Sequence, residues 1–116
     1  MRLSLCSLAL LPVLLFAGCH SPYVEATVSN QTQQRVTLIE VDYPSASFGT
    51  QALAPGADFH YRFKVLGEGK LKLTYTDPAN KEQKSEGPHL NEGAEGPLRI
   101  IIQPGGIQWQ NSTAIH

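Results

Sequence analysis

The chain has 116 residues, of which 41% are hydrophobic and 16% are charged, and its formal net charge is −1. This length suits a single domain, and the nearly neutral charge balance excludes the strongly basic proteins that bind nucleic acid. Only two cysteines are present, Cys6 and Cys19, so no cysteine-rich scaffold is expected.

The first segment has the pattern of an export signal. Arg2 supplies a positive charge, and residues 3–16 form an uncharged, mostly apolar run that is short for a bilayer-spanning helix. The run ends in Phe16-Ala17-Gly18-Cys19. This stretch resembles the lipobox of bacterial lipoproteins, which has an apolar residue, two small residues and a cysteine.

The resemblance implies that residues 1–18 are a cleaved signal peptide and that Cys19 carries a diacylglyceryl group on its sulfur. Two or three acyl chains hold a protein firmly at a membrane, whereas one chain alone is marginal. In that family Asp after the cysteine often signals inner-membrane retention, and here the residue is His20. The expected location is therefore the outer membrane, facing the periplasm. Residues 19–22 would form a short linker that keeps the domain near the membrane surface.

Residues 23–110 are expected to form one β-domain, followed by a C-terminal tail at residues 111–116, because apolar and polar residues alternate with period two. The clearest alternating segments are residues 23–29, 35–43, 58–65 and 70–76. Residues 81–87 contain no apolar side chain, which indicates an exposed edge strand or a loop. Residues 98–103 predict a strand covered on both faces at Ile101, and residues 107–109 a short last strand.

Residues 58–65 and 70–76 are expected to pair as a β-hairpin, because only the short loop Gly67-Glu68-Gly69 joins them. The expected register sets Phe63 opposite Leu73 and Tyr61 opposite Tyr75. Every apolar residue of the pair then lies on one face.

Six or seven short antiparallel strands separated by Gly and Pro turns predict an all-β fold, a β-sandwich. The stretches VSNQTQQRVTLIEV and LAPGADFHYRF resemble parts of small bacterial immunoglobulin-like domains. This resemblance implies an immunoglobulin-like β-sandwich. A transthyretin-like sandwich or a small barrel stays open as an alternative.

No catalytic residues, metal ligands or cofactor are expected. Asp58 and His60 share a strand face without an obvious nucleophile, and they are interpreted as solvated. The four histidines are far apart in sequence, and no two have the short spacing of metal ligands. They are His20, His60, His89 and His116.

One surface feature is a candidate contact for an anionic surface, either lipid headgroups or an acidic protein. In the expected hairpin, four basic residues project from one face: Arg62, Lys64, Lys70 and Lys72. The alternative is a solvated face whose charge is offset by Glu82 and Glu86 on a neighbouring strand.

These features predict a non-enzymatic, lipid-anchored envelope protein that acts as a membrane-proximal protein-interaction or accessory module. Its expected partners are the membrane, through Cys19, and an envelope protein. The alternative function is a small lipoprotein inhibitor of an envelope-directed hydrolase, with the segment VDYPSASFGTQ (residues 41–51) as the loop that would enter an active site.

Overall fold

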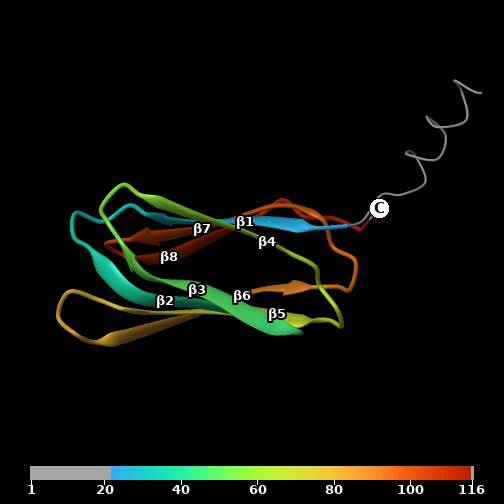
Figure 1. Cartoon of the computed structure of the whole chain (residues 1–116), viewed down its shortest axis with the longest axis horizontal. Coiled ribbons are helices and arrows are strands. Elements are labelled where there is room, and N and C mark those ends of the chain that lie inside the picture. The colour runs from blue at the N-terminus through green and yellow to red at the C-terminus, as the bar shows by residue number, and fades with distance from the viewer. Residues whose placement is uncertain (1–21, 116) are drawn as a thin grey trace, which may run out of the picture.

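The computed structural model describes residues 22–115, which form eight strands in two four-stranded sheets (Figure 1). The signal segment and Cys19 lie outside the described residues. The strands are β1 (Val24–Asn30), β2 (Val36–Tyr43), β3 (Ala46–Leu53), β4 (Asp58–Phe63), β5 (Gly69–Thr76), β6 (Glu82–Leu90), β7 (Gly96–Gln103) and β8 (Gly106–Asn111). One sheet has the order β4-β1-β7-β8 and the other β3-β2-β5-β6. The predicted all-β sandwich is confirmed at this level.

The hydrophobic core lies between the two sheets and is built from the period-two positions of the strands. Val24, Ala26 and Val28 of β1 are buried, as their alternation with polar residues predicted. The central strand β2 of the other sheet contributes Ile39 and Val41, which are also buried. Because alternate side chains of a strand point to opposite faces, each sheet keeps its polar residues on the outside.

Ile101 departs from this simple alternation. It is only 9% exposed, yet it does not belong to the core cluster that contains Ile100 and Ile102. Its side chain therefore lies on the outer face of β7. The expectation that both faces of this strand are covered at Ile101 is confirmed.

Two predictions about the strands are corrected. There are eight strands in the described residues rather than six or seven, because residues 46–53 form a strand, β3, that the sequence does not reveal. Only Phe48 and Leu53 of β3 are buried, so its sequence shows no sustained alternation. The sheets are also not wholly antiparallel, because β1 and β7 pair in parallel.

The hairpin expected from residues 58–65 and 70–76 is wrong. β4 pairs with β1, and β5 pairs with β2 and β6, so the two segments belong to different sheets. The connection at residues 64–68 crosses from one sheet to the other, and Gly67 adopts the left-handed region there, with φ 83°. The apolar faces of the two strands meet across the core. Hydrophobic alternation is the same in both arrangements, so it could not distinguish them.

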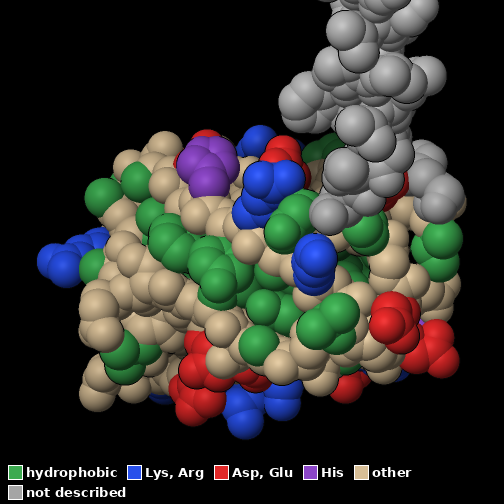
Figure 2. All heavy atoms as spheres, turned by 45° about the vertical axis from the view of Figure 1, so that its right-hand side comes forward, with side chains coloured by type: hydrophobic (Ala, Val, Ile, Leu, Met, Phe, Trp, Pro, Cys, Tyr) green, Lys and Arg blue, Asp and Glu red, His purple; other side chains and the backbone are tan. Residues whose placement is uncertain are grey.

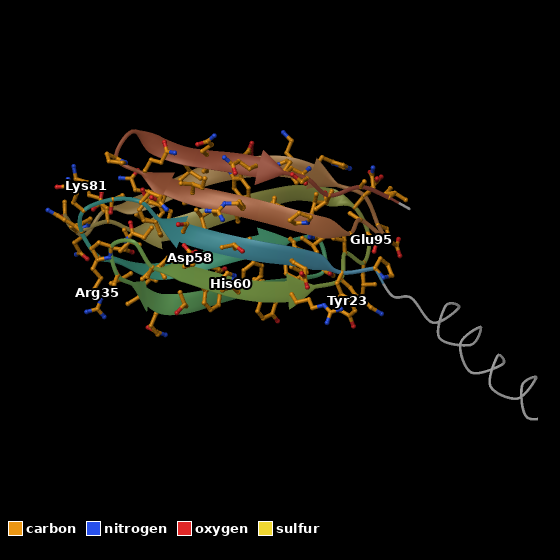
Figure 3. The ribbon with its side chains drawn as sticks, turned by 90° about the horizontal axis from the view of Figure 1, so that it is seen from above. Tyr23, Arg35, Asp58, His60, Lys81 and Glu95 are labelled. Carbon is orange, nitrogen blue, oxygen red and sulfur yellow. The ribbon has the colours of Figure 1, made fainter. Side chains whose placement is uncertain are left out.

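The strands run along the long direction of the sandwich and divide the loops between two ends. At the proximal end β1 begins beside Tyr23, and the loop that holds Glu95 enters β7. At the distal end Arg35 and Lys81 lie in the loops that follow β1 and β5 (Figure 3). Any anchor attached before residue 22 therefore joins the proximal end.

Candidate interaction surface

The four basic residues singled out in the sequence do not share one face. Arg62 lies on β4 and Lys64 directly after it, whereas Lys70 and Lys72 lie on β5 in the other sheet. The prediction of one continuous basic face is therefore wrong, since it depended on the hairpin that does not form. Whether either pair contacts an anionic surface stays a prediction.

Arg62 and Lys64 surround Tyr23 at the proximal end. The guanidinium carbon of Arg62 is 3.9 Å from the centroid of the Tyr23 ring, and Nζ of Lys64 is 5.4 Å from it. Arg62 Nε also lies 3.6 Å from Glu25 Oε1, although both side chains are more than half exposed. Such exposed pairs contribute little to stability. These contacts orient the chain where it enters β1.

The basic residues of β5 lie among carboxylates. Nζ of Lys70 is 3.9 Å from Glu86 Oε2 on β6, as the solvated-face interpretation expects. Lys72 stands between Asp42 on β2 and Glu86 on β6 in the strand register. Glu82, the second expected partner, pairs instead with Lys84 of its own strand at 3.9 Å.

Residues 41–51, the segment expected to protrude as an inhibitory loop, form a β-hairpin. They comprise the end of β2, the turn at Pro44 and Ser45, and most of β3. In this pairing Val41 faces Phe48 and Glu40 faces Gly49. The expectation of a free loop is corrected, because ladder hydrogen bonds hold the segment in the sheet.

The two long sides of the sandwich are closed differently. On the side of β6 and β8, Trp109 Nε1 donates a hydrogen bond to Ser85 Oγ at 2.9 Å. The indole lies directly against Gly87, where an added Cβ would come within 2.6 Å of the ring. Trp109 therefore bridges β8 and β6 and covers this side.

The side of β3 and β4 is closed by stacked aromatic rings, which we call the aromatic seam. It consists of Tyr43, Phe48, Phe59, Tyr61 and Phe63. Phe48 of β3 stacks on Tyr61 of β4 with ring centroids 4.4 Å apart, although the two strands belong to different sheets. Tyr61 remains 41% exposed. Figure 2 shows hydrophobic side chains at the surface over this part of the molecule, with charged ones around them.

A pair of carboxylates, Glu40 and Asp42, lies on the outer face of β2, which is turned away from the seam. The hydrogen bond to Asp42, together with the negative charge of that residue, raises the pKa of Glu40 above its ordinary value, so the two groups repel each other when both are ionised. The positive charge of Lys72, opposite Asp42 on β5, acts in the other direction and offsets part of this repulsion. Within residues 22–115 neither has a Lys or Arg nitrogen within 4.0 Å. An open hollow next to Glu40 is lined by Leu38 and Gly49, among other residues.

This part of the surface was missed in the sequence. The spacing of Glu40 and Asp42 shows that both carboxylates share a strand face. Their position opposite Gly49, however, depends on the pairing of β2 with β3, and β3 has no alternating pattern to reveal it.

The residues considered for chemistry do not converge. Asp58 and His60 lie on the outer face of β4 (Figure 3), where His60 Nδ1 is 3.0 Å from Thr27 Oγ1. His89 Nε2 is 3.4 Å from Glu68 Oε2 at another part of the surface. No group of three or more His, Cys, Asp or Glu side chains suited to a metal ion occurs in residues 22–115.

Asn30 organises the distal end from a fully buried position. Its Nδ2 donates to the carbonyl oxygens of Gln34 and Leu53, both at 2.9 Å. Its Oδ1 accepts a hydrogen bond from the Thr32 amide at 3.0 Å. Its backbone also bonds the β3–β4 connection, donating to the Ala57 carbonyl and accepting from the Gly56 amide. One side chain thus joins the loops that follow β1 and β3.

Asp77 closes the β5–β6 turn and should make the free energy of unfolding depend on pH in the acidic range. Its Oδ1 accepts from the amides of Lys81 and Ala79, and its Oδ2 from the Gln83 side chain, each at 2.9 Å. The Lys81 amide is the largest cause of a pKa below the ordinary 3.8. A lowered folded-state pKa stabilises the protein above 3.8, and this contribution is lost as pH falls through the folded value.

We expect Asp77→Asn to flatten the acid limb of the unfolding free energy, because asparagine cannot ionise. Urea unfolding at a series of pH values down to the acid limb measures this. Asp58→Asn, on an exposed strand face, is the control. An unchanged acid limb in Asp77→Asn would show that the turn carboxylate does not contribute.

Comparisons with known proteins extend the fold assignment only. No family model matches the chain, and no curated protein matches its sequence. The NMR structure of a protein from Eubacterium rectale is similar, with a TM-score of 0.59 at 15% identity, over 78% of this chain and 88% of that one. The likeness supports the all-β fold. In the part of the chain that the structure describes, no helix has the length and apolar character to cross a membrane.

Proposed function

We propose that the protein is a non-enzymatic, lipid-anchored envelope module that binds another envelope protein through the side of β3 and β4. The aromatic seam is the observation that carries this proposal. Tyr61 is 41% exposed and stacks on Phe48 of β3. Partly exposed aromatic side chains are enriched at protein interfaces.

The position of the chain entry supports a membrane-proximal role. β1 begins at Val24, only five residues after Cys19, so lipidation of that cysteine would hold the proximal end against the membrane. The seam lies on the side of β3 and β4 and begins near that end, since Phe63 pairs with Val24 at the start of β1. It would therefore face a neighbour close to the membrane surface. The outer membrane, facing the periplasm, is the proposed location.

The paired hairpin at residues 41–51 gives the inhibitor alternative less support than the interaction module. A protein that enters an active site needs a protruding loop, and residues 41–51 form a paired hairpin instead. The interaction module needs only a side surface, which the aromatic seam provides.

For the finer fold we propose the transthyretin-like alternative in place of the immunoglobulin-like one. In constant-type immunoglobulin domains the first, second, fourth and fifth strands share a sheet. Here the first and fourth lie in one sheet and the second and fifth in the other. This alternation of strands between sheets resembles transthyretin-like sandwiches.

Lipidation is tested by Cys19→Ser. We expect the variant to lose incorporation of labelled palmitate and to stay as a precursor or appear in the soluble fraction, because serine offers no thiolate to take the lipid. Fractionation and mass spectrometry of the mature N-terminus measure this. Cys6→Ser is the matched control and should be lipidated like the parent. An unmodified Cys19 thiol in the mature protein would contradict the anchor.

The binding role is tested by Tyr61→Ala, which removes the most exposed ring of the seam. We expect co-purification of partner proteins from detergent-solubilised envelopes to fall, with little change in membrane attachment. Trp109→Phe, on the side of β6 and β8, serves as the comparison. Undiminished co-purification in Tyr61→Ala would contradict a role for the seam.

A further inference from the structure

The side of β3 and β4 leaves one strand edge without a partner. β3 is the last strand of its sheet and pairs only with β2. A strand at the edge of a sheet presents unpaired backbone amide and carbonyl groups, and proteins usually protect such edges with charges, proline or bulges. β3 has neither charges nor proline, because its sequence is ASFGTQAL.

The other sheet edges of the described residues are protected or covered. β4 carries Asp58 and Arg62, and β6 carries charged residues and Pro88. β8 is also uncharged, but it is shorter than β3, and its Trp109 reaches across to Ser85 of β6. β3 is therefore the longer of the two uncharged edge strands, and its Phe48 stacks on the exposed Tyr61 of β4.

A strand added to β3 would extend the sheet β3-β2-β5-β6 by one, and its two faces would meet different surfaces. Because side chains alternate along a strand, one face would lie over the aromatic seam, where Tyr61 is exposed. The other face would lie beside the outer surface of β2 and β3. Apolar side chains suit the first position, since they would cover the exposed ring.

The outer surface of β2 carries two carboxylates, which would attract a cation on the added strand. Glu40 of β2 faces Gly49 of β3, and Asp42 faces Ser47. Gly49 has no side chain, and a Cβ there would come within 2.1 Å of the Ile39 carbonyl oxygen, so only glycine fits at this position. This leaves a gap beside Glu40, in the hollow that Glu40 and Gly49 line. Strands lie about 4.8 Å apart, so a long Lys or Arg side chain on an added strand can cross β3 at this gap.

The same gap offers contact for the stem of such a side chain. Leu38 is 58% exposed on the outer surface, at a bulge in β2 where its φ is 52°. It lines the hollow that also contains Glu40 and Gly49. The aliphatic stem of Lys or Arg would pack on Leu38, and its charge would relieve the repulsion between Glu40 and Asp42.

From these features we infer that an extended segment of a partner protein adds to the free edge of β3, with apolar side chains on the aromatic seam and a Lys or Arg over Gly49 that pairs with Glu40 and Asp42. This deepens, and rests on, the proposed role as an interaction module. Main-chain hydrogen bonds supply affinity in such strand addition, and alternate side chains supply specificity.

The test uses intact cells that produce the full chain with a photoreactive amino acid in place of Gln51, an exposed residue of β3. A second strain carries it in place of Gln110, an exposed residue of the uncharged edge strand β8. After irradiation, mass spectrometry identifies the peptides joined to each position. We expect Gln51 to give one protein segment that alternates apolar and polar residues and includes Lys or Arg.

Charge complementarity is tested by combining the Gln51 probe with substitutions. Glu40→Gln with Asp42→Asn should lower the crosslinking yield roughly fivefold, the scale of one partly exposed ion pair. Ser47→Lys, which places a cation opposite Asp42, should lower it similarly. Gln110→Lys on β8 is the matched control and should leave the yield unchanged. A midpoint of thermal unfolding equal to the parent's would confirm that each variant keeps the fold.

Several results would overturn the inference: no product at Gln51, a product with lipid or a second copy of the chain, a segment without Lys or Arg, or a parental yield from the Glu40→Gln, Asp42→Asn variant. A protein product at Gln110 with none at Gln51 would leave the interaction module standing and reject β3 as its site. No protein product at either position, with no partner co-purified, would reject both.

Discussion

Phe63→Ala is expected to lower the free energy of unfolding by about 3–5 kcal/mol, the range for deleting a buried aromatic side chain. Phe63 is only 3% exposed on β4, and its ring stacks on Tyr43 with centroids 4.1 Å apart. Its removal leaves a cavity between the sheets at the seam. Because small domains are stable by only about 5–15 kcal/mol, this loss is a large part of the total.

Urea unfolding of a soluble Cys19→Ser form of the chain measures the effect. Lys64→Ala is the matched control one residue beyond β4: its side chain is exposed and its amine lies 5.4 Å from the Tyr23 ring centroid, so the change should be small. Equal and small effects of the two substitutions would show that Phe63 does not point into the core.

The strand alternation was readable from sequence because burial in a sandwich repeats every two residues. It correctly placed Ile39 and Val41 in the core. For residues 81–87 it left an exposed edge strand or a loop open, and residues 82–87 lie on the edge strand β6. Pairing was not readable. Phe63 and Leu73 face the same core from different sheets, and this arrangement leaves the same pattern in the sequence as a hairpin does.

The wrong strand pairing also led to a wrong prediction of which surface residues share a face. Lys64 and Lys72 belong to one face only if β4 and β5 are neighbours, and they are not. Conversely, Glu40 and Gly49 are nine residues apart in sequence and become opposite only through the β2–β3 register. Surface features of a sandwich depend on which strands are adjacent, and single-sequence patterns constrain this far less than they constrain burial.

The two long sides of the sandwich differ in how suitable they are for binding a partner. On the β6–β8 side the indole of Trp109 spans both strands, and its nitrogen donates a hydrogen bond to Ser85. The β3–β4 side combines an exposed tyrosine with an uncharged strand edge, and Glu40 and Asp42 lie on the outer face of the neighbouring strand β2. A bound segment could cover the tyrosine, pair with the strand edge and place a cation near the carboxylates. This side is therefore the better candidate for recognition.

Asn30→Ala is expected to destabilise the protein by about 2–4 kcal/mol, because it leaves buried polar groups without partners. The Leu53 carbonyl loses a buried hydrogen bond from Asn30, and the Thr32 amide loses its acceptor. Gln33→Ala in the same loop is the control, since that side chain is exposed. Urea unfolding compares the two, and an equally small loss in both would contradict the role of Asn30.

Asn30→Asp separates the hydrogen bonds from the packing, because it keeps the shape but replaces the two donors of Nδ2 with an oxygen. At neutral pH the carboxylate would face the carbonyl oxygens of Gln34 and Leu53, now as an acceptor against acceptors. Burial would raise its folded-state pKa above the unfolded value, so protonation favours the folded state. The variant should therefore regain stability as pH falls through that raised pKa, when one donor returns, while Asn30→Ala shows no such recovery. Parallel pH profiles of the two variants would mean that Asn30 acts through its volume and not through its hydrogen bonds.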